Sequence, residues 1–279
     1  MKELRETDVI DIEASLQEVR RRIAQAAARV GRDPNGITLV AVTKRVSAER
    51  IVAAYQLGIR HFGENRVQEA QAKIPTVNRW LEATPPPGPT SDFGLRTARL
   101  SGSAETSDLT WHMVGHLQRN KVKRALELFD IIHSVDSVRL AREISRRCQR
   151  AERTMPILLE VNVSGEGTKY GFAPGEIKAA VEDMVTLPGL TIQGLMTMAP
   201  IVEDPEEARP YFRRLRQLRD ELRGGFPQVE WRHLSMGMTD DFEVAVEEGA
   251  TMVRIGRAIF GQESTSQKPA PYIFRQRRG

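Results

Sequence analysis

Residues 37–44 read ITLVAVTK, an apolar run whose only charged side chain is Lys44, at its carboxyl end. Such a run is typical of a β-strand, and alternation places Val40, Val42 and Lys44 on one face. In a parallel sheet the amine would then emerge at the carboxyl rim, on the side that holds the core. An ε-amine in an apolar pocket loses its proton more easily and can form a Schiff base with an aldehyde. The alternative is a strand-end lysine that extends its amine into solvent.

Segments typical of strands and of helices alternate along the rest of the chain. An amphipathic helix ends near Gly31 and Pro34, and about eight strand and helix pairs follow it, which favours a parallel sheet. We predict a single (β/α)8 TIM barrel with an amino-terminal helix, because 279 residues fit a barrel of about 250 residues and one insertion. A doubly wound open sheet is the alternative. The predicted strands are Ile37–Thr43, Arg60–Gly63, Thr110–Val114, Asp130–Ser134, Met155–Val163, Leu190–Met198, Glu230–Met236 and Thr251–Ile255.

Two segments differ from this pattern in composition. Residues 84–108 contain PPPGP and SGSAETSD and few bulky apolar residues, which predicts one long, flexible inserted loop. A short ordered lid is the alternative. Residues 262–279 form a short, basic tail that contains prolines. We therefore predict one domain over residues 1–279.

Composition argues against several classes of protein. With 40% hydrophobic and 28% charged residues the chain is typical of a soluble globular protein, and no apolar run approaches the roughly 20 residues of a membrane helix. The charged amino terminus is unlike a signal peptide, and Cys148 has no partner for an intrachain disulfide, so we expect a cytoplasmic protein. The net charge is only +4, and the arginines alternate with acidic residues in helical segments. This favours solvated helix faces over a nucleic-acid site.

The sequence around the last two predicted strands has the features of a phosphate site. In barrels of this kind the loops after strands seven and eight frequently bind phosphate through backbone N–H groups at the start of a short helix. Ser235 can donate a hydroxyl group, Gly237 and Gly256 allow an anion to approach closely, and the N–H groups of Gly256 and Arg257 would point at it. Glycines that serve only as turn residues are the alternative.

Strand parity also predicts an arginine inside the barrel mouth. Met252, Arg254 and Gly256 share one face, so the Arg254 guanidinium should lie inside and needs an acceptor there. A ligand and a buried ion pair with a barrel carboxylate are the two alternatives. We expect no metal site, because core or hydrogen-bonding roles are commoner for histidines near strand ends, here His112, His116 and His133.

A rim lysine, phosphate donors and an inward arginine together suit a ligand with an aldehyde, a phosphate and a ring nitrogen. Pyridoxal 5′-phosphate has all three. Between about Ile12 and Gly261 the chain contains, in order, the blocks AVTK, HFGENRVQEA, WHMVGHLQRNK, IHSVDS, TKYGF, GLMTMAP and HLSMGMTDDFEVAVEEGATMVRIGRAIFG. In these blocks the chain resembles the pyridoxal phosphate homeostasis protein family. It departs from the family in the longer segment Thr84–Asp108 and in Arg66, where many members carry an aromatic residue.

The resemblance implies a barrel like the amino-terminal domain of alanine racemase, with pyridoxal phosphate held as an internal aldimine on Lys44. It also implies that Ser235 and the Gly256–Arg257 turn hold the phosphate and that Arg254 faces the pyridine nitrogen. An arginine does not readily give up a proton, so the ring nitrogen should stay unprotonated and the cofactor should be a poor electron sink. Asn65 in GENRVQE either hydrogen-bonds near the ring or serves as a turn residue.

Three functions remain open. The first is a cofactor carrier without catalytic residues, a monomer or weak dimer that stores, buffers or delivers pyridoxal phosphate, with apo forms of the enzymes that need it as partners. The second is a racemase-like enzyme, which requires a base on each face of the substrate Cα, one of them a tyrosine supplied in similar racemases with the help of a further β-domain. The third is an aldolase-like barrel that uses Lys44 for a Schiff base with a sugar phosphate.

Overall fold

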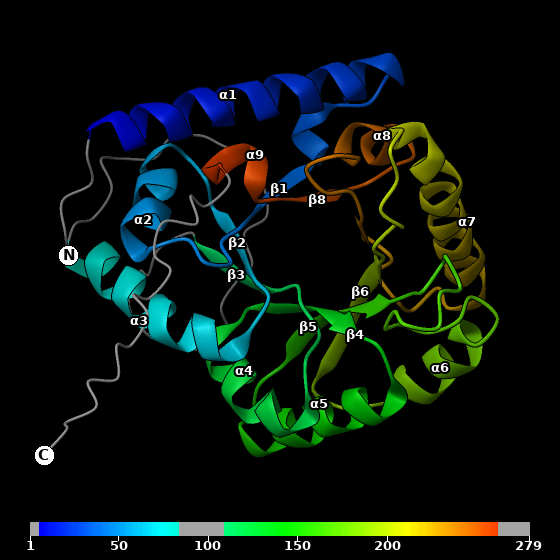
Figure 1. Cartoon of the computed structure of the whole chain (residues 1–279). Coiled ribbons are helices and arrows are strands. Elements are labelled where there is room, and N and C mark those ends of the chain that lie inside the picture. Colours follow the sequence, from blue (N-terminus) through cyan, green and yellow to red (C-terminus); the bar gives the residue numbers. More distant parts are fainter. Residues whose placement is uncertain (1–5, 84–108, 262–279) are drawn as a thin grey trace, which may run out of the picture.

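The computed structural model describes residues 6–83 and 109–261. Within these ranges eight parallel strands close into a barrel in chain order, and helices surround it (Figure 1). β1 pairs with both β2 and β8, so the barrel prediction is confirmed and the open sheet is excluded. The predicted insertion at residues 84–108 and the tail at residues 262–279 lie outside the described residues.

All eight predicted strands are present, with bounds that differ by a few residues. The largest differences at a boundary are three residues, at the end of the fifth strand and at the start of the seventh, which was predicted to begin at Glu230. There the amides of Trp231 and Arg232 bond two residues back to Val229 and Glu230, so this segment makes local turns before the sheet begins. The strands are β1 (Thr38–Val42), β2 (His61–Glu64), β3 (Thr110–Met113), β4 (Ile131–Val135), β5 (Met155–Glu160), β6 (Leu190–Met196), β7 (His233–Ser235) and β8 (Met252–Ile255).

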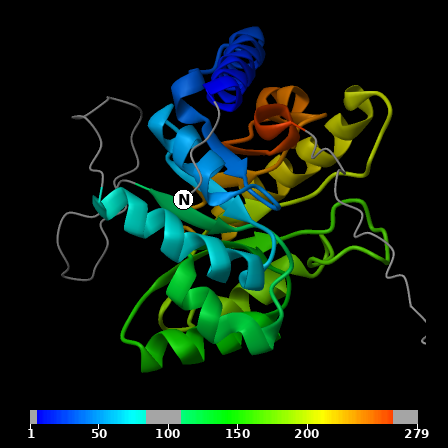
Figure 2. The ribbon, with the colours of Figure 1, turned by 60° about the vertical axis from the view of Figure 1, so that its left-hand side comes forward.

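The amino-terminal helix lies on the outside of the barrel, where the first and last strands meet (Figures 1 and 2). It buries Ile12, Leu16, Val19 and Ile23, a helical spacing that gives it one apolar face. None of the described helices combines the length and the apolar composition of a membrane span. The helices are α1 (Glu6–Arg29), α2 (Ala48–Gln56), α3 (Val67–Ala83), α4 (Val122–Leu128), α5 (Val138–Arg150), α6 (Ile177–Met184), α7 (Arg209–Gly225), α8 (Phe242–Glu247) and α9 (Arg257–Phe260).

The apolar core has two parts. The larger fills the space between strands and helices and includes Cys148 of α5. The smaller is formed by side chains from five strands that point into the barrel: Val40, Ile131, Leu158, Met196 and Met252. Strand alternation requires both layers, because each strand buries one face inward and the other against the helices.

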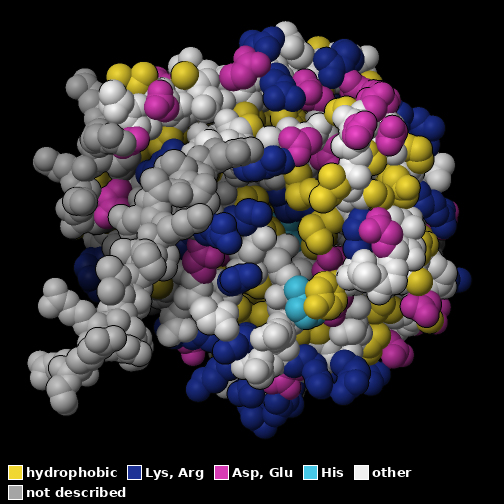
Figure 3. All heavy atoms as spheres, viewed as in Figure 1, with side chains coloured by type: hydrophobic (Ala, Val, Ile, Leu, Met, Phe, Trp, Pro, Cys, Tyr) yellow, Lys and Arg dark blue, Asp and Glu magenta, His cyan; other side chains and the backbone are white. Residues whose placement is uncertain are grey.

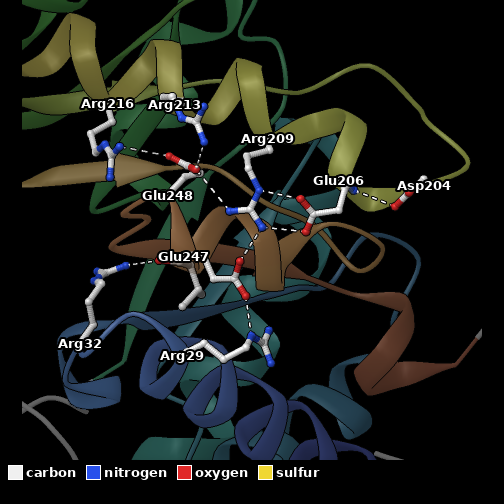
Figure 4. A network of polar contacts seen from close by, with 10 residues as sticks. Arg29, Arg32, Asp204, Glu206, Arg209, Arg213, Arg216, Glu247 and Glu248 are labelled. Carbon is white, nitrogen blue, oxygen red and sulfur yellow. Dashed lines mark hydrogen bonds and ion pairs between the residues drawn. The ribbon is translucent and has the colours of Figure 1, made fainter.

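A cluster of ion pairs joins the outer helices (Figure 4). Glu248, at the end of α8, lies within 3.0–3.2 Å of Arg209, Arg213 and Arg216 of α7. Glu247 pairs at 2.5 Å with both Arg209 and Arg29 of α1. These arginines therefore link α1 and α7 to the end of α8. Arg213 and Arg216, which were predicted to lie on a solvated helix face, are 50% and 38% exposed. On the face seen in Figure 3, basic and acidic side chains are interspersed.

Candidate functional site

Lys44 lies just beyond β1, at the predicted carboxyl rim. β1 ends at Val42, and Lys44 with Arg45 forms a turn in which Arg45 has a φ of +59°. The alternation that was predicted to carry Lys44 onto the inner face therefore stops before it reaches this residue. The Lys44 side chain is exposed, as in the alternative of a lysine that extends into solvent, and not in the apolar pocket predicted for its amine. It is accessible to a ligand. Its predicted Schiff-base role stays a prediction.

Helix α3 holds the turn on both sides of Lys44. On one side, Lys73 donates to the carbonyl oxygen of Thr43 at 2.6 Å. On the other, a Glu69 carboxylate oxygen accepts the amide N–H of Arg45. The Thr43 hydroxyl bonds to buried Glu64 at 2.7 Å, and Lys73 pairs with Glu64 at 2.7 Å and with Glu69 at 2.9 Å. The backbone around Lys44 is thus fixed while its side chain is left to solvent.

The glycine turn after β8 lies against the end of β1. A Cβ atom added at Gly256 would lie 2.9 Å from the Val42 carbonyl oxygen, so only glycine allows this approach without a shift of β1. Helix α9 begins directly after Gly256. The backbone N–H groups of its first turn have no acceptor within the helix, because they lie at its amino-terminal end. Lys44 and the Gly256–Arg257 turn are therefore brought to the same part of the rim, while the Arg257 side chain pairs with Asp240.

Arg254 lies inside the barrel, as strand parity predicted. It is only 4% exposed. Its Nη1 donates to Ser235 Oγ at 2.6 Å and its Nη2 to the Thr197 carbonyl oxygen at 2.8 Å. Among the described residues no carboxylate forms an ion pair with it, so a hydroxyl and a carbonyl take the place of the barrel carboxylate considered above. Burial lowers the pKa of Arg254 to about 10, partly offset by Asp241 and Glu160, and it remains a cation at neutral pH.

The remaining predicted residues have defined places. Ser235 is fully buried, and its hydroxyl lies between Arg254 and His133. Gly237 has a φ of +90°, and a Cβ atom there would lie 2.6 Å from Ala245 Cβ, so it packs the loop onto α8. Asn65 is half-buried directly after β2. Contacts of Ser235, Gly237 and Asn65 with a ligand stay predictions.

Glu160, at the end of β5, is a residue that our sequence reasoning missed. It is 3% exposed, and its Oε2 has no hydrogen-bond partner among the described residues. Burial, reinforced by nearby Asp136 and opposed by Arg254, raises the pKa of Glu160 to about 7. The signal was available, because MPILLE ends in a lone charge after an apolar run, as ITLVAVTK does.

Glu160→Gln should stabilise the protein above pH 7. The folded protein keeps a proton on Glu160 that the unfolded chain releases near the ordinary pKa of 4.5. The contribution of Glu160 to the free energy of unfolding is therefore fully present below pH 4.5. It falls by about 3 kcal/mol as the pH rises from 4.5 to about 7. Denaturant titrations at pH 4.5 and pH 8 should show a gain for the variant only at pH 8. An equal gain at both would show that the carboxyl is not neutral in the fold.

His112, His116 and His133 make polar contacts, as expected. Within residues 6–83 and 109–261 no group of three or more His, Cys, Asp or Glu side chains is arranged to hold a metal ion. His116 pairs with Asp136 at 2.9 Å and stacks on the exposed ring of Tyr170, with a centroid distance of 3.7 Å. His112 and His133 lie inside the barrel.

Comparison with known proteins identifies the family. A family model described as alanine racemase, N-terminal domain, matches residues 14–264. A pyridoxal phosphate homeostasis protein of Aquifex aeolicus is 41% identical over 247 residues, 88% of this chain and 96% of that protein. The chain belongs to the pyridoxal phosphate homeostasis protein family. The resemblance read from the sequence blocks is thereby confirmed.

Several solved structures are similar to this member of the pyridoxal phosphate homeostasis protein family, among them the following two. One is a protein from Bifidobacterium adolescentis described as unknown, 36% identical with a TM-score of 0.82, covering 93% of this chain and 98% of that chain. The other is PipY of Synechococcus elongatus with pyridoxal phosphate bound, 36% identical with a TM-score of 0.68, covering 86% and 100%. Every predicted site residue lies within the span of the family model.

Proposed function

We propose that this chain binds pyridoxal 5′-phosphate, holds it as a Schiff base on Lys44, and serves to store, buffer or deliver it in the cytoplasm. The observation that carries the proposal is the gathering of an accessible amine, a glycine turn and an inward arginine at one end of one barrel. PipY, solved with this cofactor bound, has a similar fold over its whole length.

The donor set fits the chemistry of this cofactor. Two Arg254 nitrogens are engaged by Ser235 and Thr197, and for its remaining N–H groups no acceptor is recorded in the described part of the chain. A guanidinium offers five N–H groups and no lone pair, so Arg254 can donate to a ring nitrogen but cannot accept its proton. The first amides of α9 can donate to phosphate oxygens, and the turn around Lys44 is held in place for the aldehyde.

The same arrangement favours a carrier over an enzyme. Bound pyridoxal phosphate supplies an electron sink for carbanions when its ring nitrogen is protonated. Arg254 would disfavour protonation of the ring nitrogen, because its positive charge and its N–H donors would face that nitrogen. The protein would then retain the cofactor's aldehyde without turning amino acids over rapidly, and recipient apoenzymes are the proposed partners.

One observation favours a racemase-like second candidate. Tyr170 is 54% exposed on the loop after β5, and its ring is held against His116, which pairs with Asp136. Tyrosine is the residue type that serves as one base in similar racemases, and His116 lies beside this tyrosine. The two candidates make opposite predictions for exchange of the substrate Cα proton.

The deciding experiment uses the purified holoprotein. It is incubated with each common amino acid in deuterated water while Cα exchange and chirality are followed, and in parallel with an apo-transaminase whose reactivation is measured. We expect reactivation and negligible exchange. Exchange above about one per second would instead establish the racemase-like activity. A protein that binds no pyridoxal phosphate at all would refute both candidates.

A further inference from the structure

A continuous line of hydrogen-bonded side chains crosses the inside of the barrel and ends at Arg254. His61 Nδ1 lies 3.0 Å from His112 Nε2, and His112 Nδ1 lies 2.8 Å from His133 Nε2. His133 Nδ1 lies 2.9 Å from Ser235 Oγ, which accepts from Arg254. His61 opens β2 and Ser235 ends β7, so the line runs from the amino-terminal end of the barrel towards the rim.

The chemistry of the groups sets the direction of these hydrogen bonds. Arg254 can only donate, so Ser235 Oγ must accept from it. The Ser235 hydroxyl hydrogen then has His133 Nδ1 as its only recorded acceptor in the described part of the chain. A neutral His133 that accepts at Nδ1 carries its proton on Nε2 and donates to His112 Nδ1. His112 in turn carries its proton on Nε2 and donates to His61.

The reverse direction of these hydrogen bonds leaves the buried Ser235 hydroxyl without an acceptor. If His133 Nδ1 donated to Ser235, the serine oxygen would accept twice and its own hydrogen would have no recorded partner among the described residues. An unmet buried donor is costly, which disfavours this arrangement. Protonation of the inner histidines is disfavoured as well, because burial and their charged or histidine neighbours lower the pKa values of His112 and His133 well below 6.5.

We infer that His133 is a positioning residue: with His112 and His61 behind it, it fixes the Ser235 hydroxyl and thereby holds Arg254 as a donor towards the bound ligand. This inference rests on the proposed function for the identity of the ligand. It assigns to Ser235 a role in orienting Arg254, in place of the phosphate contact predicted from the sequence. The line of histidines acts as one unit, because reversing any member requires reversing the others.

The first test needs no ligand. In the ligand-free protein labelled with 15N at histidine, the imidazole nitrogen shifts report which ring nitrogen carries the proton. We expect the Nε2–H tautomer for His112 and His133 at pH 7. An Nδ1–H tautomer at His133 would reverse the direction and overturn the inference, whether or not pyridoxal phosphate binds.

The second test separates positioning from packing. His133→Phe keeps a ring but removes the acceptor for Ser235, and His133→Asn restores an acceptor near the place of Nδ1. Loss of one such hydrogen bond should weaken pyridoxal phosphate binding by up to about tenfold and shift the absorption maximum of the bound cofactor. The Asn variant should recover both. His233→Phe is the matched control, since His233 is a buried barrel histidine outside the line. Equal effects of His133→Phe and His233→Phe would reduce His133 to a packing residue.

The third test separates the two roles of Ser235. If Ser235 acts through Arg254, Ser235→Ala should weaken binding of pyridoxal phosphate and of unphosphorylated pyridoxal by the same factor. A loss confined to the phosphorylated ligand would show a phosphate contact and overturn the positioning role. If the wild type binds neither ligand, the proposed function fails, while the tautomer measurement still decides the direction of the line.

Discussion

Lys44→Ala should abolish covalent attachment of pyridoxal phosphate while leaving the fold intact. Lys44 lies in an exposed turn, so its side chain contributes little packing energy, and the contacts that hold the turn are made by Thr43 and Arg45. Borohydride reduction of the wild type followed by peptide mass spectrometry should place the adduct on Lys44. The variant should show no adduct, no absorption from a protein Schiff base, and a far-ultraviolet circular dichroism spectrum like that of the wild type.

Lys73 is the other amine near the Lys44 turn and serves as the control for the site of attachment of pyridoxal phosphate. Its Nζ is bound to Thr43, Glu64 and Glu69 within 2.9 Å, and it is only 12% exposed, so it should not react. Recovery of the adduct on Lys73, or on Lys121 or Lys169, would contradict the assignment of Lys44.

Glu248→Gln should destabilise the packing of the outer helices strongly. The Glu248 side chain is 6% exposed and is surrounded by Arg209, Arg213 and Arg216. Removing one partner of a buried ion pair costs about 3–5 kcal/mol, because the remaining charges lose their compensation. The lower end of this range applies here, since the three arginines are 23–50% exposed. For a chain of this size, a loss of 3 kcal/mol lowers the melting temperature by roughly 6–12 °C. Thermal unfolding at low and high salt should show the difference, which high salt should reduce.

Asp183→Asn is the matched control for that measurement. It breaks the pair of Arg142 with Asp183, whose side chains are 60% and 56% exposed. An exposed pair contributes about 0–1 kcal/mol, so the melting temperature should change little. Similar losses in the two variants would show that the cluster around Glu248 behaves as a surface feature.

The barrel and the positions of the main site residues could be predicted from local pattern. Apolar runs of strand length alternate along the chain with segments of helical spacing. The period of each segment decides which of its residues face the core, whichever side chains they contact there. Parity therefore placed Arg254 inside the barrel correctly, and the end of an apolar run placed Lys44 at the rim. The family could be read as well, because several blocks occur in a fixed order.

The sequence by itself determined the order of the elements, the closed barrel and the rim position of Lys44, since these depend on periodicity and on short-range backbone preferences. Only the tertiary structure decided which side chains meet. Ser235 and His133 are 102 positions apart in the chain, and their contact depends on the curvature and register of a closed sheet. The turn after β1 depends on tertiary contacts in the same way, since Lys73 and Glu69 of α3 bond to the backbone of Thr43 and Arg45. No local pattern encodes such contacts, because hydrogen bonds between distant strands are fixed only when the barrel closes.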